Sequence, residues 1–569
     1  MAIKTSTKIN VFMFLMSLVL LAPAFIGYIM KLKIKLYIDF ALSVYGINSI
    51  VFLIIQIICA IKNSKKINEM RESRPVNWDI LGVGLVIVGY REEKILLKKC
   101  LESIKNSKYT NIKRIIFIID GNDIDDLYMA DIYKEVFPEN QVINVDFLVG
   151  ENVKENKYID YEIFGKDDIC ILQPHGGKRE GLYTGFKLFL NDPSIDVIIT
   201  TDSDTIVDEM AITELTYASN KANVGAVAGQ ILVWNSSDSI LTHIISYRYW
   251  FSFNLERACE SYWETVLCIA GPMGCYKAHT LSIILDEWYN QTFLGQNCTF
   301  GDDRHLTNRI LKTGQKVIYT EHAIGYTDTP IKYGQYYKQQ TRWSKSYFRE
   351  FLFNLQALFL HSFWMTYELT YQIVYYFLLM YWSVYILYFG SVQQQSIAII
   401  ITLIMSIIKS LYGVIKEKNI NYIFFYLYSY IYTLIIVPSK LHALITLWDM
   451  EWGTRGKAKS LLSAYWSIIV WYSTLIGGFA YSIYKNYEFK ITYSYYKIAF
   501  ICLMIYVGII VITFLLEYIL RKNKYFSNAI EQNINNENFQ LKNITIDNYE
   551  LCLTPKLNET EMAIKTALI

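Results

Sequence analysis

Apolar residues form long stretches on both sides of a central region of mixed pattern in this 569-residue chain. Residues 9–30 form a run long enough to span a bilayer, and a second run at about 39–61 follows directly. The second run argues against a cleaved signal peptide. Apolar segments return towards the C-terminus, at 364–390, 396–412, 420–437, 462–484 and 497–520. This pattern predicts an α-helical membrane protein.

Between these stretches, residues 80–330 have the pattern of an α/β domain. Short apolar runs are typical of buried strands, and helical patterns lie between them. The runs include 85–89, 115–119 and 197–200, and the helical patterns include 92–103 and 179–190. Such alternation predicts a mostly parallel, Rossmann-like sheet, which binds its ligands at the carboxyl ends of its strands.

The patterns divide the chain into five expected parts. These are two N-terminal transmembrane helices with a basic linker (1–75), the α/β domain (76–330), amphipathic interface helices (331–360), C-terminal transmembrane and interface helices (361–520) and a polar tail (521–569). The Asn-rich tail is expected to be disordered because it has too few apolar residues to bury. The basic linker favours a cytosolic position for the chain that follows it, by the positive-inside rule.

Composition supports a membrane location and argues against a nucleic-acid partner. The chain is 53% hydrophobic with a mean hydropathy of +0.21, which is rare in a soluble protein of this length. A net charge of +2 implies no global polyelectrolyte partner, so we expect no nucleic acid. The nine cysteines lack CxxC or metal-binding spacing, and their odd number indicates reduced thiols facing the cytosol.

Polar residues follow the first two predicted strands. Tyr90 and Glu92 come just after the run 85–89, and Asp120 comes just after 115–119. A carboxylate at a strand end suits hydrogen bonding to a nucleotide base or ribose. The alternative at each position is a turn that caps the next helix.

A glycine pair stands where the helical pattern 179–190 begins, in the motif His175-Gly176-Gly177-Lys178. Two glycines let backbone amides approach a phosphate, and the helix N-terminus and Lys178 add positive charge. The alternative is a helix cap with a solvated lysine. His175 by itself is better explained as a structural residue than as a catalytic one.

Two carboxylates, Asp202 and Asp204, follow the run 197–200. Side chains two positions apart on an extended backbone point the same way. The pair can therefore hold one Mg²⁺ or Mn²⁺ together with a nucleotide diphosphate. Such a triplet also arises by chance, but its place after a strand favours metal binding.

The sharpest motif is the tetrapeptide Gly301-Asp302-Asp303-Arg304. A hydroxyl that attacks an anomeric carbon needs a base within hydrogen-bond reach, and a second acid and an arginine beside that base tune its pKa and orientation. Aspartate also suits a helix N-cap, and the two roles are compatible. Upstream, the aromatic residues of 249–253 either pack in the core or, with the glycine-bracketed turn 271–274, shape a sugar pocket. Cys268 is expected to be a small buried hydrophobic residue rather than a nucleophile, because no activating histidine is evident.

Taken in order, these motifs resemble the membrane family 2 glycosyltransferases, which include cellulose, chitin and hyaluronan synthases. Gln339, Arg342 and Trp343 complete the resemblance as a Gln-x-x-Arg-Trp motif. The strings 298–308, 339–346 and 452–455 are similar to hyaluronan synthases of the vertebrate and algal-virus class. Chitin synthases typically show Glu-Asp-Arg and a more basic Gln-x-x-Arg-Trp string. The resemblance covers roughly residues 10–520.

The resemblance implies a processive, inverting hyaluronan synthase that uses UDP-N-acetylglucosamine and UDP-glucuronate with Mg²⁺ or Mn²⁺ and extrudes nascent hyaluronan. Asp303 would be the base beside Asp302, and Asp202 and Asp204 would hold the metal. The other implied substrate-binding residues are Tyr90, Glu92, Asp120, Lys178, Cys268, Arg304, Gln339, Arg342, Trp343, Trp452 and Arg455. A chitin synthase-like enzyme is the alternative. A transporter without catalysis would not need this set of acids beside Trp343.

Topology follows from the implied role of Trp452 and Arg455, which would close over bound nucleotide in the cytosol. The number of crossings between the α/β domain and this loop must then be even. We therefore expect one segment within 356–447 to lie along the membrane interface, ending near Pro438. The chain would have six crossings, both termini in the cytosol, and contacts with membrane lipid. It would act as a monomer, with the plasma membrane as its expected site.

Ionisable residues in or beside the apolar segments indicate where the polymer would leave. Glu368 and Lys409 stand at such positions, where side chains usually face a protein interior or a water path. For Lys409, a side chain that reaches the membrane surface is an equal alternative.

Overall fold

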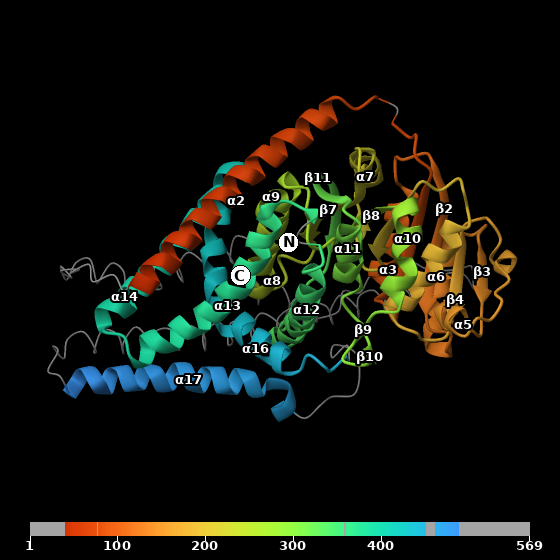
Figure 1. Ribbon diagram of the computed structural model, residues 1–569. Helices are drawn as coiled ribbons and strands as arrows, with labels where there is room; N and C mark the ends of the chain where they lie inside the picture. Colours follow the sequence, from red (N-terminus) through yellow and green to blue (C-terminus); the bar gives the residue numbers. More distant parts are fainter. Residues whose placement is uncertain (1–39, 77, 358–359, 451–460, 489–569) are drawn as a thin grey trace, which may run out of the picture. The chain divides into compact units, whose positions relative to one another are not determined.

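The computed structural model describes residues 40–76, 78–357, 360–450 and 461–488. The predicted segments 9–30 and 497–520, the loop with Trp452 and Arg455, and the polar tail lie outside the described residues. The described part contains a nine-stranded sheet in the order β3-β4-β2-β1-β5-β8-β7-β11-β6. Figure 1 labels β3, β4, β2, β8, β7 and β11 of this sheet. Its strands are β1 Val83–Gly89, β2 Ile112–Asp120, β3 Gln141–Asn144, β4 Ile169–Gln173, β5 Val197–Asp202, β6 Ile206–Val207, β7 Val224–Val233, β8 Gly274–Lys277 and β11 Lys316–Thr327.

The sheet is mostly parallel, which confirms the predicted fold class. Strands β3, β4, β2, β1 and β5 are parallel neighbours, and β7 is parallel to β11. Strand β8 runs antiparallel between β5 and β7, and β6 is antiparallel to β11. All seven residues of β1 are buried, as expected for a strand with helices on both sides. The predicted runs 85–89, 115–119 and 197–200 fall inside β1, β2 and β5.

Helices cover both faces of the sheet. A Cβ on Gly181 or Gly185 of α6 would press against Val88 or Val86 of β1, so these glycines let α6 pack closely on one face. On the other face, a Cβ on Gly89 would meet Met129 of α4 at 2.6 Å. The helices around the sheet are α3 Lys94–Lys105, α4 Leu127–Val136, α5 Val149–Lys154, α6 Lys178–Leu190, α7 Ala211–Ser219, α8 Ile240–Phe251, α9 Ala258–Tyr262, α10 Ala278–Tyr289 and α11 Asp302–Lys312.

Shorter elements complete the α/β part. Between α8 and α9 the helix widens into a π-helical stretch, η3, which spans Ser252–Arg257. Such stretches often occur at functional sites. The others are the 3-10 turns η1 Ile124–Asp126 and η2 Tyr161–Phe164, and the hairpin strands β9 Thr292–Phe293 and β10 Gln296–Asn297.

The apolar segments form helices near the predicted positions. Three stretches of the described residues are long and apolar enough to cross a membrane: Ala398–Glu417, Ile420–Ile445 and Tyr465–Lys485. The predicted segment 364–390 forms α13 but is not one of the three. The elements are α12 Tyr333–Asn354, α13 Phe363–Tyr388, α14 Val392–Glu417, η5 Ile420–Leu427, α15 Tyr428–Ile431, η6 Tyr432–Ile436, α16 Val437–Ile445 and α17 Leu461–Glu488.

The helix α2, Phe40–Glu72, is longer than the apolar run that predicts it. The basic stretch that follows the run is not a separate linker but continues the same helix. Lysine, arginine and glutamate are good helix formers, and Arg71 and Arg74 both pair with the buried Glu214 of α7, at 3.0 and 2.8 Å. This ion-pair cluster joins the end of α2 to the α/β domain.

Candidate active site

The first part of the candidate site is a turn held by Asp120, the last residue of β2. Its Oδ1 accepts hydrogen bonds from the amides of Gly176 at 2.8 Å and Gly177 at 3.0 Å. Its Oδ2 lies 2.9 Å from Nδ1 of His175. The carboxylate therefore orients the glycine pair that begins α6, and the predicted contact of Asp120 with uridine stays a prediction.

An aromatic pair lies beside this turn. The ring of Tyr90, just after β1, stacks on His175 with centroids 4.3 Å apart. The hydrogen bond to Asp120 raises the pKa of His175 to about 9, so the imidazole carries a positive charge at neutral pH. A flat pair with positive charge at the carboxyl ends of β1 and β2 suits a planar anionic ligand.

The second part of the site is an ion pair between Lys178 and Asp202, at the start of α6 and the end of β5. Burial lowers the pKa of Lys178, but the charges of Asp202 and Asp302 outweigh it and keep that pKa above its ordinary value. A Cβ on Gly271 would lie 3.0 Å from Nζ of Lys178. The turn 271–274 thus brings backbone against the ion pair, as expected for a wall of a binding pocket.

Asp204 is the carboxylate with the most perturbed environment near this ion pair. Burial, followed by the charges of Asp202 and Glu92, raises the pKa of Asp204 to about 7. Crowded carboxylates of this kind are oxygen ligands that a hard divalent cation accepts. In the described part of the chain, no three His, Cys, Asp or Glu side chains are placed to hold a metal together. Asp202 and Asp204 would therefore need further oxygens from a ligand.

The third part is the acid pair Asp302-Asp303, which begins α11 after Gly301. Oδ1 of Asp303 accepts a hydrogen bond from the amide of Arg304 at 2.7 Å, and Sγ of Cys268 lies 3.7 Å from its Oδ2. Burial and then the charge of Asp302 raise the pKa of Asp303, while Arg304 opposes the shift. A raised carboxyl pKa improves a general base, because proton affinity increases with pKa.

The fourth part is the helix α12, which carries Gln339, Arg342 and Trp343. The side chain of Gln339 has a buried Oε1 that accepts no hydrogen bond from the described residues. The ring of Trp343 is 40% exposed and lies 6.5 Å from that of Tyr249. An indole that stays partly open beside buried polar atoms suits a stacking surface for a sugar ring.

Charges place the last three of these parts around one site, and the start of α6 links the first part to them. The charges of Asp202, Asp302 and Asp303 all act on Lys178, so the acid pair lies near the ion pair. The charges of Asp202, Asp204 and Arg342 all act on the hydroxyl of Tyr249. The structure therefore brings the predicted residues of β5, α6, α11 and α12 together, whereas Trp452 and Arg455 lie outside the described residues.

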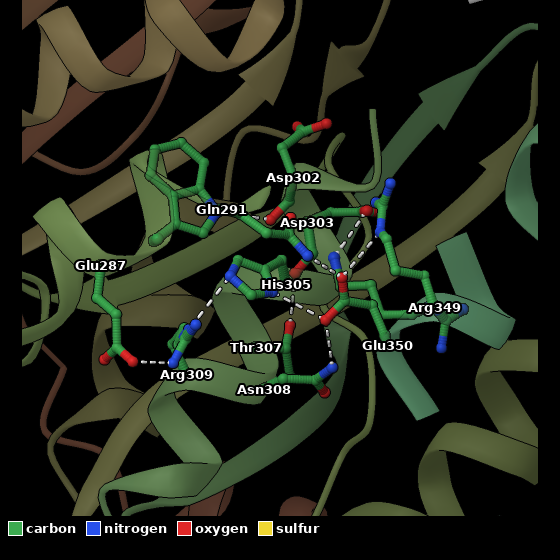
Figure 2. Close-up of polar contacts among 12 residues, drawn as sticks. Glu287, Gln291, Asp302, Asp303, His305, Thr307, Asn308, Arg309, Arg349 and Glu350 are labelled. Atoms are coloured by element: carbon green, nitrogen blue, oxygen red, sulfur yellow. Dashed lines mark hydrogen bonds and ion pairs between the residues drawn. The ribbon is translucent and has the colours of Figure 1, made fainter. Parts of the chain in front are cut away.

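Several residues hold the site together through contacts that the sequence does not reveal. Lys345 of α12 pairs with Asp449 at 3.2 Å, and Thr299 donates a hydrogen bond to the carbonyl of Met450. Below the acid pair, Figure 2 shows a buried polar cluster around Glu350 of α12. Only the alternation of charged and apolar residues in α12 indicates that some of its charges are buried.

The chain is similar to known glycosyltransferases. A family model described as "Glycosyltransferase like family 2" matches residues 82–346, which run from β1 to the Gln-x-x-Arg-Trp motif. Hyaluronan synthase 1 of Xenopus laevis is 36% identical over 497 residues, or 82% of this chain and 84% of the relative. Hyaluronan synthase 2 of Rattus norvegicus and of Homo sapiens are each 36% identical over 464 residues, or 79% of this chain and 83% of each relative.

A more distant likeness exists among solved structures. A mannosyltransferase of Pyrobaculum calidifontis, in complex with GDP-Man and Mn²⁺, aligns with 72% of this chain and 100% of its own, at 13% identity and a TM-score of 0.38. A similarity this low carries no argument about the site.

Proposed function

Since this chain belongs to the hyaluronan synthases, and is therefore a UDP-sugar glycosyltransferase that makes hyaluronan, we propose how it does so. It joins N-acetylglucosamine and glucuronate alternately from their UDP derivatives on the cytosolic face. The enzyme keeps the growing polymer bound and extrudes it across the plasma membrane. It works as a single protein chain in contact with membrane lipid. The observation that carries the proposal is the acid pair Asp302-Asp303 beside the Lys178–Asp202 ion pair.

The proposed reaction is one in-line displacement that inverts the anomeric carbon. Asp303 takes the proton from the acceptor hydroxyl, whose oxygen forms the new bond to C1 of the donor sugar. The bond between C1 and the diphosphate oxygen breaks, and UDP leaves with its electron pair. Lys178 and Arg342 balance the charge of the leaving group in a largely buried site, where such stabilisation is strong.

We propose positions for the substrates on the same residues. The stacked pair Tyr90 and His175, with Asp120 and Glu92 nearby, would receive the uridine. Trp343 would lie under the acceptor sugar. Cys268, Arg304 and Gln339 would line the pocket around the base, and Trp452 and Arg455 would act on the nucleotide from their loop.

The product test separates this function from its alternative. Purified full-length protein in lipid nanodiscs, given both UDP-sugars, should make a polymer that hyaluronidase digests completely and chitinase leaves intact. UDP-N-acetylglucosamine alone should yield no long polymer. A chitinase-sensitive polymer from that single donor would show a chitin synthase-like enzyme instead.

Metal dependence is expected because Asp202 and Asp204 fit a divalent cation. Bound there, Mg²⁺ or Mn²⁺ would supply positive charge to the diphosphate of the donor. EDTA should stop polymer synthesis, and either ion should restore it. Asp204→Asn should remain inactive at saturating Mg²⁺, whereas Glu209→Gln, an exposed acid on the same segment, should behave as wild type. Full activity in the chelator would show that the two carboxylates are structural.

An exit for the polymer is proposed at the membrane-side helices. Lys409 of α14 pairs with Glu256 at 2.9 Å, and Arg248 pairs with the same carboxylate at 2.8 Å. Glu368 of α13 is buried and accepts a hydrogen bond from Nε1 of Trp364 at 2.9 Å. Lys409 thus faces protein rather than the membrane surface, and charged groups inside such helices usually mark a path for polar cargo.

A further inference from the structure

Glu350 is a fully buried carboxylate in the part of α12 that follows the Gln-x-x-Arg-Trp motif. Its Oε1 accepts from Nε2 of Gln291 at 2.6 Å and from Nε of Arg349 at 3.4 Å (Figure 2). Its Oε2 accepts from Nδ1 of His305 at 2.8 Å and from Nδ2 of Asn308 at 3.0 Å. A buried charge is costly unless it is paired and hydrogen-bonded, and here both oxygens are fully used. We call these five residues the Glu350 cluster.

Protonation inside the cluster is set by its geometry. Nδ1 of His305 donates to Glu350, and its Nε2 accepts from Nε of Arg309 at 3.1 Å. Burial lowers the pKa of His305 to about 4, so its imidazole is neutral with the proton on Nδ1. Burial raises the pKa of Glu350, but the hydrogen bond from His305 and the charge of Arg349 outweigh it and bring that pKa to about 2. Glu350 is therefore ionised throughout the working pH range.

The cluster joins three elements of the active site. His305 and Asn308 lie on α11, which begins with the acid pair. Oε1 of Gln291 accepts from Arg179 at 2.9 Å, and Arg179 follows Lys178 at the start of α6. Arg349 donates to the carbonyl of Phe300 at 2.6 Å, just before the turn into α11. Glu350 itself lies on the helix that presents Arg342 and Trp343.

We propose that Glu350 is a positioning residue for glycosyl transfer: it fixes the base helix α11 against α12 and α6. The proposal rests on the proposed role of Asp303 as base. No described hydrogen bond or ion pair joins Glu350 to the carboxylates of the acid pair, so it acts through the helices. A displacement of about 1 Å at a reacting group can cost about 10²-fold in rate, so secure placement has a kinetic value. A buried ionic cluster contributes little net stability compared with apolar residues, which favours placement as its role.

Glu350→Gln is the most informative variant because it keeps the shape of the side chain, removes its negative charge and replaces one acceptor oxygen by an NH₂ donor. Its new amide N–H must face one of the two donor sets. If this N–H points at Nδ1 of His305, the imidazole proton must move to Nε2, where it meets the N–H of Arg309. If it points at Gln291 instead, the Gln291 amide must flip, and its NH₂ then faces the N–H groups of Arg179. Neither arrangement can satisfy all donors, so α11 and α12 must shift relative to each other.

The test compares kcat and KM for both UDP-sugars in full-length protein in nanodiscs. Glu350→Gln should lower kcat by about 10²-fold while each KM changes less than threefold. Glu287→Gln is the matched control, since this half-exposed acid pairs with Arg309 and Lys312 at the outer edge of the network. It should keep wild-type kinetics, as surface pairs contribute little. Asn308→Ala removes one donor only and should fold while lowering kcat with KM unchanged.

The outcomes separate this inference from the proposed function. Asp303→Asn is measured in parallel. If Glu350→Gln keeps more than half of the wild-type kcat while Asp303→Asn is inactive, Glu350 does not position the base, and the base assignment stands. If Asp303→Asn is active, the base assignment fails and the inference fails with it. If Glu350→Gln does not fold, Asn308→Ala decides: an unchanged kcat overturns the proposal, and a lowered kcat at constant KM supports it.

Discussion

Asp303→Asn should abolish polymer synthesis while UDP binding stays near normal. Asparagine has the size of aspartate but cannot take the proton of the acceptor hydroxyl, so only the base role is lost. General-base catalysis contributes about 10²–10⁴-fold, and the rate should fall by this factor. Polymer formation from both UDP-sugars gives the rate, and isothermal titration with UDP gives the affinity. More than half of the wild-type rate in the purified variant would contradict the assignment.

The pH dependence of kcat is a second test of Asp303 as the base. Burial and then the charge of Asp302 raise the pKa of Asp303, and the base works only when it is deprotonated. Wild-type kcat should therefore decline with falling pH at a higher pH than an ordinary carboxyl would give. In Asp302→Asn the neighbouring charge is absent, so this decline should move to lower pH. A shift in the opposite direction would mean that another group limits the rate.

Much of the site could be predicted because its motifs follow strands or begin helices. Strand and helix patterns are local, so the order of residues alone is enough to place Asp120 and Asp202 at strand ends. Parallel topology then brings those ends to one edge. The membrane helices are predicted for the same reason, since apolar runs of sufficient length are visible in the sequence alone.

What could not be predicted depends on contacts between distant residues. Glu350 is 42 to 59 positions from Asn308, His305 and Gln291, and the pattern of α12 indicates only that some of its charges are buried, without singling out Glu350. The place of Cys268 is similar: its sequence context predicts a small buried residue, but only packing puts its sulfur beside Asp303. The full length of α2 could not be predicted from the apolar run, because charged residues end such a run without ending the helix.

The interfacial segment stays a prediction. The residues 420–445 form successive 3-10, α and π turns, and Pro438 lies at the start of α16, where proline is tolerated. The same stretch, Ile420–Ile445, is long and apolar enough to cross a membrane.

Gly301→Ala should lose both stability and activity, and Gly314→Ala provides a matched control. The two glycines bracket α11, and both have φ of +78°, a conformation that costs an L-residue about 1–2 kcal/mol. They differ in their surroundings. A Cβ at Gly314 would meet no atom of the described residues within 4 Å, whereas at Gly301 it would collide with Oγ of Ser346 and lie 2.7 Å from Nη2 of Arg349. Both of these side chains belong to α12.

The shared conformational cost should lower the unfolding midpoint of both variants, measured by thermal unfolding in detergent. Only Gly301→Ala adds a steric conflict, which costs about 1–3 kcal/mol further and pushes α12 away from the acid pair. Its kcat should fall by about 10²-fold, because Asp303 then lies out of line with Arg342 and Trp343, while Gly314→Ala should keep its kcat. Equal loss of activity in the two variants would trace the effect to backbone strain, and the close approach of α12 to the base helix would then have no catalytic role.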